Sequence, residues 1–462
     1  MKRRNFLKKS LYTSLAAGGL FSSGGMLQLI NAAAAQNISN RGDADYKALV
    51  CVFMDGGNDS ANMIVPRGIS EYQAYAGVRG DLALPQSDLL AINDPINNGG
   101  RSWGLHPELP GLQNLFNNNT AAVVGNVGSL AYPITQQEFN NNSVPKPPNL
   151  FSHIDQKNQW QTSVADAPSI SGWAERIADL LHATENGGNP LSMNISLAGN
   201  NQLQVGAQIS QYQMSNSGSL SLSDSGYQDA VARNNALTQL LNANNSHFFQ
   251  QGYADIFNRA IDVDQIISSA LLNTPNLGVT FPEQPGSNSL SAQLEMVARM
   301  ISVNSTLGVN RQVFFCSVGG FDNHDNHIVD HALGMRNLNG AVSAFQQAIN
   351  NLQLQQQVTL FTASDFSRTW RSNGQGSDHG WGASHFVVGG AVNGGDFYGA
   401  MPVIEPDSSD AISDHGRTIP TIAVDEYGAT LARWFDVPGN QINTIFPNIG
   451  RFNSSDLGFM GS

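Results

Sequence analysis

The chain has 462 residues, with 23 Lys and Arg against 36 Asp and Glu, so its formal net charge at pH 7 is −13. An acidic field of this kind repels polyanions, which argues against nucleic acid and anionic membrane surfaces as partners. The length exceeds one ordinary domain and predicts one large α/β domain with insertions, or two domains.

The N-terminal segment has the features of an export signal. Arg3 and Arg4 lie in a short basic run, an apolar stretch follows at 11–30, and small residues at 32–35 suit a signal peptidase. We expect a cleaved twin-arginine signal peptide over residues 1–35 rather than a membrane anchor, because Ser, Thr and Gly dilute the apolar stretch. Cleavage removes five of the 23 basic residues and no acidic one, leaving 18 against 36, or −18. The expected location is therefore the periplasm or cell surface, with no stable membrane insertion.

Apolar runs followed by glycine or polar residues are typical of strands that are buried on both faces of a parallel sheet. Five such runs occur, at Ala48 to Met54, Ala121 to Val127, Val313 to Val318, Val358 to Ala363 and Phe386 to Val388. Helical spacing predicts helices at 170–183, 290–307 and 331–354. This alternation predicts a doubly wound, largely parallel α/β sheet with helices on both faces. Cys51 and Cys316 lie inside two of the runs, so we expect buried strand residues rather than a disulfide.

The segment 186–289 differs in composition from the rest, being rich in Asn, Gln, Ser and Gly. Helices are expected within it at 227–242 and 248–272. We interpret it as a polar helical insert or cap on an α/β domain that spans residues 46–450.

Chemically active side chains follow the predicted strands. In sheets of this kind functional groups gather beyond the carboxyl ends of the strands, where Asp59, Asp322 and Asp365 are expected to lie. Three histidines, His324, His327 and His331, fall close to Asp322, and at least one of them is a candidate metal ligand. A solvated helix face is the alternative interpretation of the three histidines.

Six short motifs occur in a fixed order along the chain. They are G-G-N-D at 56–59, G-L-H-P at 104–107, Ser152–His153 with Trp160, G-W at 172–173, G-G-F-D-x-H at 319–324, and D-H-G at 378–380 before G-G at 389–390. Over about residues 48–447 this order resembles the secreted family called domain of unknown function 1501. The resemblance implies the fold of the alkaline phosphatase and sulfatase superfamily, with a metal-centred site at the strand ends.

The resemblance also implies roles for individual residues. Asp55 or Asp59 matches the carboxylate after the first strand, and Ser152 matches a nucleophile at a helix N-terminus, which favours an alkoxide. The remaining implied ligands are Asp322 with His324 or His327, Asp365 and His379. These oxygen and imidazole ligands suit a divalent ion: zinc, magnesium, manganese or calcium.

Each assignment has a structural alternative. Ser152 and Asp59 can be helix N-caps, and Arg368, expected to bind an anion, can instead pair with an acid. Asp365 is followed by Phe366, where superfamily hydrolases commonly have histidine. With this ligand replaced, the sequence leaves open whether the site binds a single metal ion, a different metal ion or none. Sulfatases need a Cys or Ser in a local context of Pro and Arg, and the stretch 144–152 lacks this context. We therefore do not expect a sulfatase with a modified cysteine.

Two functions follow from these observations. The first is an exported metal-dependent hydrolase of phosphate or sulfate esters with a small-molecule substrate. The second is a catalytically inactive phosphatase-like protein that binds or assembles with a partner. Because members of the resembling family occur beside genes for domain of unknown function 1800, a co-exported protein of that family is the expected partner.

Overall fold

The computed structural model describes residues 45–461, apart from 98, 207–208, 210, 220–228, 244–247 and 413–414. The expected signal peptide at 1–35 lies outside the described residues. Within the described part of the chain, no helix combines the length and the apolarity that crossing a membrane requires.

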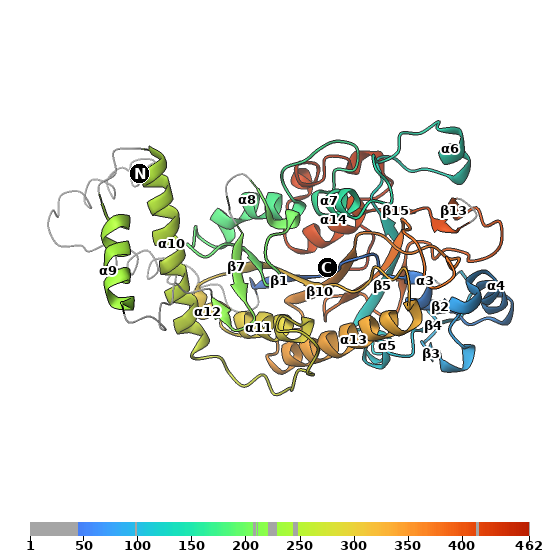
Figure 1. Ribbon diagram of the computed structural model, residues 1–462, viewed down its shortest axis with the longest axis horizontal. Helices are drawn as coiled ribbons and strands as arrows, with labels where there is room; N and C mark the ends of the chain where they lie inside the picture. Colours follow the sequence, from blue (N-terminus) through green and yellow to red (C-terminus); the bar gives the residue numbers. More distant parts are fainter. Residues whose placement is uncertain are drawn as a thin grey trace.

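A mixed ten-stranded sheet forms the centre of the molecule (Figure 1). Its strands are β1 (Lys47–Met54), β5 (Ala121–Gly128), β6 (Asn194–Ser196), β7 (Tyr212–Ser215), β8 (Gly218–Ser219), β9 (Arg311–Val318), β10 (Val358–Ser364), β11 (Ala383–Val388), β12 (Phe397–Tyr398) and β15 (Ile422–Ala423). They lie in the order β12-β5-β11-β10-β1-β9-β6-β7-β8, and β15 pairs with β5. All five predicted strands are present, and the predicted α/β sheet is confirmed.

Two strands depart from the parallel arrangement: β8, which is antiparallel to β7, and β11. β1 is parallel to β9 and β10, but β11 runs antiparallel to both β10 and β5. The connection between β10 and β11, residues 365–382, contains no helix, whereas a parallel crossover needs a long connection that is usually helical. This connection therefore lies at the same edge as the carboxyl ends of β1, β9 and β10.

Helices cover both faces of the sheet (Figure 1). One face carries α5 (Pro110–Asn117), α11 (Leu290–Ser302) and α13 (His327–Asn351), and the other carries α7 (His153–Thr162), α8 (Trp173–Glu185) and α14 (Val424–Trp434). Alternate residues of β1 point to opposite faces: Val50 and Val52 join the core beneath α11 and α13, and Leu49 and Phe53 join the core beneath α8 and α14.

The predictions for these helices and for the cysteines have clear outcomes. Both cysteines are free and fully buried in strands, as predicted. The predicted 290–307 helix is divided into α11 and α12 (Asn304–Leu307). The helix predicted from residue 170 begins only at Trp173, so Ile170 lies outside its apolar face and is 90% exposed.

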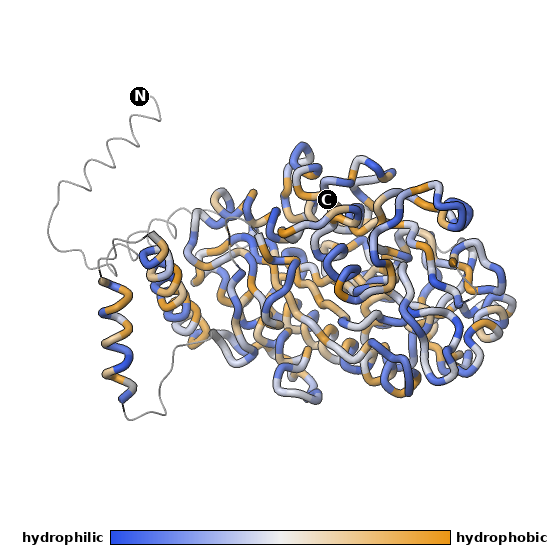
Figure 2. Tube along the Cα trace, turned by 45° about the horizontal axis from the view of Figure 1, so that its top comes forward, coloured by the Kyte–Doolittle hydropathy of each residue, from blue (hydrophilic) through white to orange (hydrophobic). Residues whose placement is uncertain are grey.

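The segment 186–289 is partly sheet. Its strands β6, β7 and β8 extend the central sheet beside β9, and only its later part forms the helices α9 (Ala230–Leu241) and α10 (Phe248–Leu271). Both helices lie at one end of the molecule (Figures 1 and 2). The polar composition does not indicate the buried strand β6, in which Asn194 Nδ2 is accommodated by donating to Glu175 Oε2 at 2.6 Å.

Smaller elements surround the sheet. They are α3 (Ser60–Met63), β2 (Ile64–Pro66), α4 (Ile69–Arg79), β3 (Leu90–Ala91), β4 (Trp103–Leu105), α6 (Gln136–Asn141), β13 (Ala411–Ile412), β14 (Arg417–Thr418) and α15 (Ile442–Ile445). β2, β4 and β3 form a separate sheet, and β13 pairs with β14.

Candidate metal centre

Three side chains from distant parts of the sequence meet at the edge where β1, β9 and β10 end. His153 is the first residue of α7, Asp322 follows β9, and His379 lies in the β10–β11 connection. His153 Nε2 lies 3.1 Å from His379 Nε2. Asp322 Oδ1 lies 3.4 Å from His153 Nε2 and 3.3 Å from His379 Nε2. The three donor atoms thus form a nearly equilateral triangle.

A fourth donor lies beside this triangle. His324 Nε2 is 2.9 Å from His379 Nε2 and 3.1 Å from Asp322 Oδ1. The side chains of His324 and Asp322 are 45% and 48% exposed. The cluster therefore faces solvent, where a ligand can reach it.

The opposite side of each imidazole ring is held by an acceptor. His153 Nδ1 donates to Asp365 Oδ2 at 2.7 Å, and His379 Nδ1 donates to the carbonyl oxygen of Phe151 at 2.7 Å. His324 Nδ1 contacts Asp378 Oδ1 at 3.2 Å. Because carboxylates and carbonyls only accept, each ring carries its proton on Nδ1 and presents the lone pair of Nε2 to the cluster.

This donor set fits a divalent metal ion. In neutral rings of this tautomer the Nε2 atoms carry no proton, so their lone pairs and the carboxylate repel each other unless a metal cation or an added proton lies between them. Zinc binds imidazole nitrogen at about 2.0–2.1 Å, so two ligands of a tetrahedral site lie about 3.3 Å apart. The observed triangle of 3.1–3.4 Å has this size. Acceptors behind metal-binding histidines, such as Asp365 here, are a usual accompaniment of metal sites.

Burial, hydrogen bonds and neighbouring charges shift the pKa values of the three donor residues. Burial acts to raise the pKa of Asp322, but the hydrogen bond and charge of Arg368 outweigh it and lower that pKa. Burial lowers the pKa of His379, which favours the neutral ring. The bond to Asp365 raises the pKa of His153. Since metals bind carboxylate and neutral imidazole, Asp322 and His379 are in the ligating form at neutral pH.

Arg368 orients Asp322. Its guanidinium is fully buried, and Nη1 donates to Asp322 Oδ1 at 2.8 Å and to the carbonyl oxygen of Gly56 at 3.2 Å. Nε donates to Ser377 Oγ at 3.2 Å, and Nη2 donates to the Ser377 carbonyl. These protein acceptors take four of the five N–H groups of the buried Arg368, which favours the alternative that it pairs with an acid; anion binding by Arg368 stays a prediction.

Gly56 explains part of the G-G-N-D motif. Its φ of +116° is a conformation that side-chain-bearing residues rarely adopt. A Cβ there would lie 2.5 Å from the backbone nitrogen of Asp322. The turn after β1 thus packs its backbone directly against the backbone of the metal-site carboxylate.

Ser152 has the geometry of a helix N-cap. It precedes α7, and its Oγ accepts from the backbone nitrogen of Asp155 at 3.5 Å and donates to Asp155 Oδ2 at 2.5 Å. Among the described residues, no hydrogen bond joins this hydroxyl to the cluster. The arrangement favours a structural role of Ser152 as the N-cap of α7 over a role as the nucleophile.

Asp55 and Asp59 lie outside the donor triangle. Asp55 is paired with Lys157 Nζ at 2.6 Å. Asp59 is fully buried, caps α3 through the backbone nitrogen of Ala61 and forms ion pairs with Arg79 and His327. Burial opposes ionisation of Asp59, but the charge of Arg79 and the hydrogen bond from His327 lower its pKa far below the usual range. His327, an expected ligand, is thus part of this second buried network.

Arg417 has guanidinium N–H groups available to bind an anion, whereas those of Arg368 are largely taken by protein acceptors. Its Nε donates to the carbonyl oxygen of His379 at 2.8 Å, and its guanidinium carbon lies 4.3 Å from the centroid of the Phe151 ring. In the described part of the chain, its Nη atoms have no hydrogen-bond partner. A guanidinium anchored to a ligand's own backbone is well placed to contact an anion near the cluster.

His153 is the member of the candidate site that the sequence interpretation does not include. Asp322, His324 and His379 were expected as ligands and are brought together, while Asp365 lies behind His153 instead of in the triangle. The Ser152–His153 pair at a helix start was a visible signal. The hydroxyl was preferred as the functional group, although its imidazole neighbour is the better metal ligand.

The sequence matches the family described as protein of unknown function, DUF1501, over residues 46–420. No curated protein matches the chain. Three solved structures illustrate the similarity in fold. The PsFucS1 sulfatase from Pseudoalteromonas sp. has 8% identity and a TM-score of 0.33, over 95% of this chain and 74% of that one. The lipoteichoic acid synthase LtaP from Listeria monocytogenes has 8% identity and a TM-score of 0.32, over 83% and 80%. The periplasmic domain of EptC from Escherichia coli, solved with zinc, has 10% identity and a TM-score of 0.27, over 74% and 72%.

Proposed function

We propose that this chain, which belongs to the DUF1501 family of proteins of unknown function, is a metal-dependent hydrolase of phosphate or sulfate esters. The observation that carries the proposal is the triangle of His153, Asp322 and His379, whose donor atoms lie 3.1–3.4 Å apart with their Nε2 lone pairs turned inward. A bound divalent ion supplies Lewis acidity, which polarises an ester oxygen and makes water a stronger nucleophile.

The protein's own residues supply orientation and charge. Asp365 and the Phe151 carbonyl fix the ring orientations of His153 and His379. Arg368 holds Asp322 ionised, and Arg417 presents a guanidinium that can contact the anionic group of an ester. Because Ser152 is engaged as an N-cap, we infer that water rather than this hydroxyl attacks the ester.

Metal removal tests the proposed activity. Protein treated with a chelator should lose hydrolysis of 4-nitrophenyl phosphate or 4-nitrophenyl sulfate. Addition of zinc, magnesium, manganese or calcium, tried one at a time, should restore it. The measurement is release of nitrophenolate, with folding followed by circular dichroism. Equal, non-zero rates with and without metal would contradict the metal dependence, and no turnover of either ester by folded, metal-loaded protein would leave the inactive binding or assembly protein as the better account.

The same assay includes a variant of the proposed anion contact. Arg417→Met should raise KM for both esters by about ten-fold or more, because a charged hydrogen bond contributes roughly 1.5–3 kcal/mol. Metal content should stay unchanged, since the contacts of Arg417 are with the backbone oxygen of His379 and the ring of Phe151 and not with the donor atoms of the triangle. An unchanged KM would remove Arg417 from the site.

Export by the twin-arginine route is a second part of the proposal. The support is the Arg3 and Arg4 pair ahead of an apolar stretch and small residues. Replacing both arginines by lysine should leave uncleaved precursor in the cytoplasm, because lysine does not reproduce the planar guanidinium. Fractionation and immunoblotting measure this, and normal processing of the variant would contradict the assignment.

A further inference from the structure

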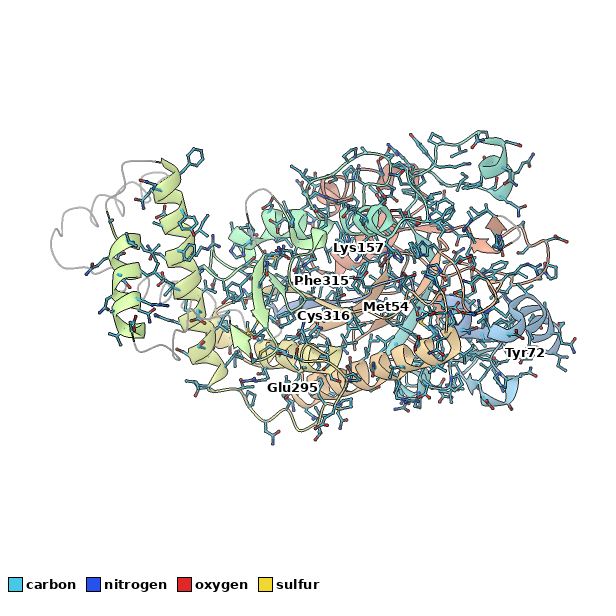
Figure 3. All side chains as sticks on the ribbon, viewed as in Figure 1. Met54, Tyr72, Lys157, Glu295, Phe315 and Cys316 are labelled. Atoms are coloured by element: carbon cyan, nitrogen blue, oxygen red, sulfur yellow. The ribbon has the colours of Figure 1, made fainter. Side chains whose placement is uncertain are left out.

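A cavity of about 370 Å³ lies at the edge of the sheet where the metal centre lies. It is lined by Phe53, Asp55, Lys157, Asn158, Gln161, Ala198, Asn200, Asn201, Gln202, Val205, Phe315 and Ser317. These residues come from the ends of β1 and β9, from the loop after β6 and from α7. Lys157 and Phe315, labelled in Figure 3, mark the α7 side and the sheet side of this cavity. Its volume is within the range of small-molecule sites, about 300–1,000 Å³.

Two structural links join this cavity to the metal centre. Lys157 lies four residues after His153 on α7, hence on the same helix face and about 6 Å further along the axis. Asp55, its partner at 2.6 Å, precedes Gly56, whose backbone nitrogen contacts Asp365 Oδ1 at 3.4 Å. A molecule that fills the cavity and extends along α7 by about one turn, roughly 6 Å, would approach His153. Neither this cavity nor a larger one of about 490 Å³ beside Trp370 and Arg371 is itself lined by His153, Asp322 or His379, and the links through α7 and through Asp55 are found only for the smaller one.

The lining favours a neutral, hydroxyl-rich ligand. Its two charged side chains, Lys157 and Asp55, neutralise each other, so neither an anion nor a cation is attracted by net charge. Its amides can both donate and accept, and a ligand hydroxyl does the same. Phe53 and Phe315 add apolar surface.

Two amides are available for such a ligand. Asn158 is exposed on α7, and the described residues give its side chain no hydrogen-bond partner. Gln202 Nε2 is buried and has no partner within the described part of the chain. A buried donor without a partner is unfavourable. Gln202 lines the cavity, so a rotation of its side chain would bring this donor to a ligand oxygen.

We propose that this cavity binds a neutral carbohydrate unit, which forms the alcohol part of the ester presented to the metal centre. The identification as the alcohol part rests on the proposed hydrolase function. The binding of the carbohydrate unit does not, because it follows from the amides and the neutral charge of the cavity.

The test separates binding from hydrolysis. Neutral, unsubstituted disaccharides are titrated against the full mature protein, and affinity is measured by ligand-observed NMR. Asn158→Ala and Gln202→Leu should each weaken binding by about three- to ten-fold, the effect of one lost hydrogen bond. Asn114→Ala, which removes an exposed amide from α5 on the other side of the sheet, is the matched control and should bind like the wild type. Circular dichroism and the thermal midpoint confirm that each variant is folded.

The outcomes are distinct. Loss of affinity in Asn158→Ala and Gln202→Leu but not in Asn114→Ala supports the carbohydrate site, whether or not the aryl esters are hydrolysed. Failure of every neutral disaccharide to bind the folded wild type overturns it, as does equal affinity in all variants. If disaccharides bind as expected and no ester is cleaved, the carbohydrate site stands and only the hydrolase proposal fails.

Discussion

His153→Ala should lower the rate of aryl ester hydrolysis by roughly 10³-fold or more, whereas Ser152→Ala should leave most of the rate intact. The imidazole of His153 contributes one corner of the donor triangle, with Nε2 3.1 Å from His379 Nε2. Metal ions contribute several kcal/mol to catalysis, and each 1.36 kcal/mol is a factor of ten in rate. The measurement is kcat for 4-nitrophenyl phosphate or sulfate with saturating metal.

The thermal midpoint separates the roles of these adjacent residues. Loss of the Ser152 cap should cost about 1 kcal/mol of stability, so Ser152→Ala should melt earlier while it still turns over substrate. A Ser152→Ala protein with an unchanged midpoint and a rate reduced by orders of magnitude would restore the nucleophile role. It would equally argue against water as the attacking group.

His379→Ala and Asp322→Ala should abolish stoichiometric metal binding. Each removes one corner of the triangle, and Asp322 also supplies its negative charge. Asp365→Asn should weaken metal affinity by about 10–100-fold, because the carboxylate behind a ligating histidine fixes its orientation and raises its basicity. Elemental analysis after dialysis, followed by competition with a chromogenic chelator, measures both effects.

His415→Ala is the matched control for loss of a histidine. His415 is exposed, and its backbone oxygen accepts from the backbone nitrogen of Arg371, so the substitution leaves the cluster intact and should leave the metal content unchanged. Native protein that is folded and carries no stoichiometric ion would contradict the metal centre. Retention of a full equivalent by His379→Ala would contradict the assignment of its ligands.

The sequence predicted the sheet better than it predicted the site. Continuous apolar runs such as 313–318 are a strong signal for buried strands because both faces must be apolar. The sequence gives no such signal for the direction of β11, because an apolar pattern is compatible with parallel and with antiparallel pairing. Which of the two occurs depends on the connection that precedes the strand. The strand β6 has only three residues, two of them polar, and its burial depends on contacts such as the hydrogen bond from Asn194 Nδ2 to Glu175, which the local sequence does not indicate.

The ligand set was partly predictable for a similar reason. Asp322, His324 and His379 follow or precede recognisable strands, so their convergence could be expected. The separation of Asp59 from the cluster could not, because it depends on Arg79 and His327, which lie in other elements and bury its charge. Nor does the sequence indicate that Ser377 and Gly56 occupy the donors of Arg368, since those are contacts between distant segments.

The three corners of the donor triangle are far apart along the chain, at positions 153, 322 and 379. A cation held by them would tie three distant segments of the folded chain together at one edge of the sheet. Because such an ion binds the folded chain and not the scattered ligands of the unfolded one, the free energy of unfolding should rise with the concentration of free ion relative to its dissociation constant. On the proposed metal site, the resistance of this protein to unfolding is thus a property of its surroundings as well as of its sequence, and depletion of the ion should loosen the same edge of the sheet that carries the proposed chemistry.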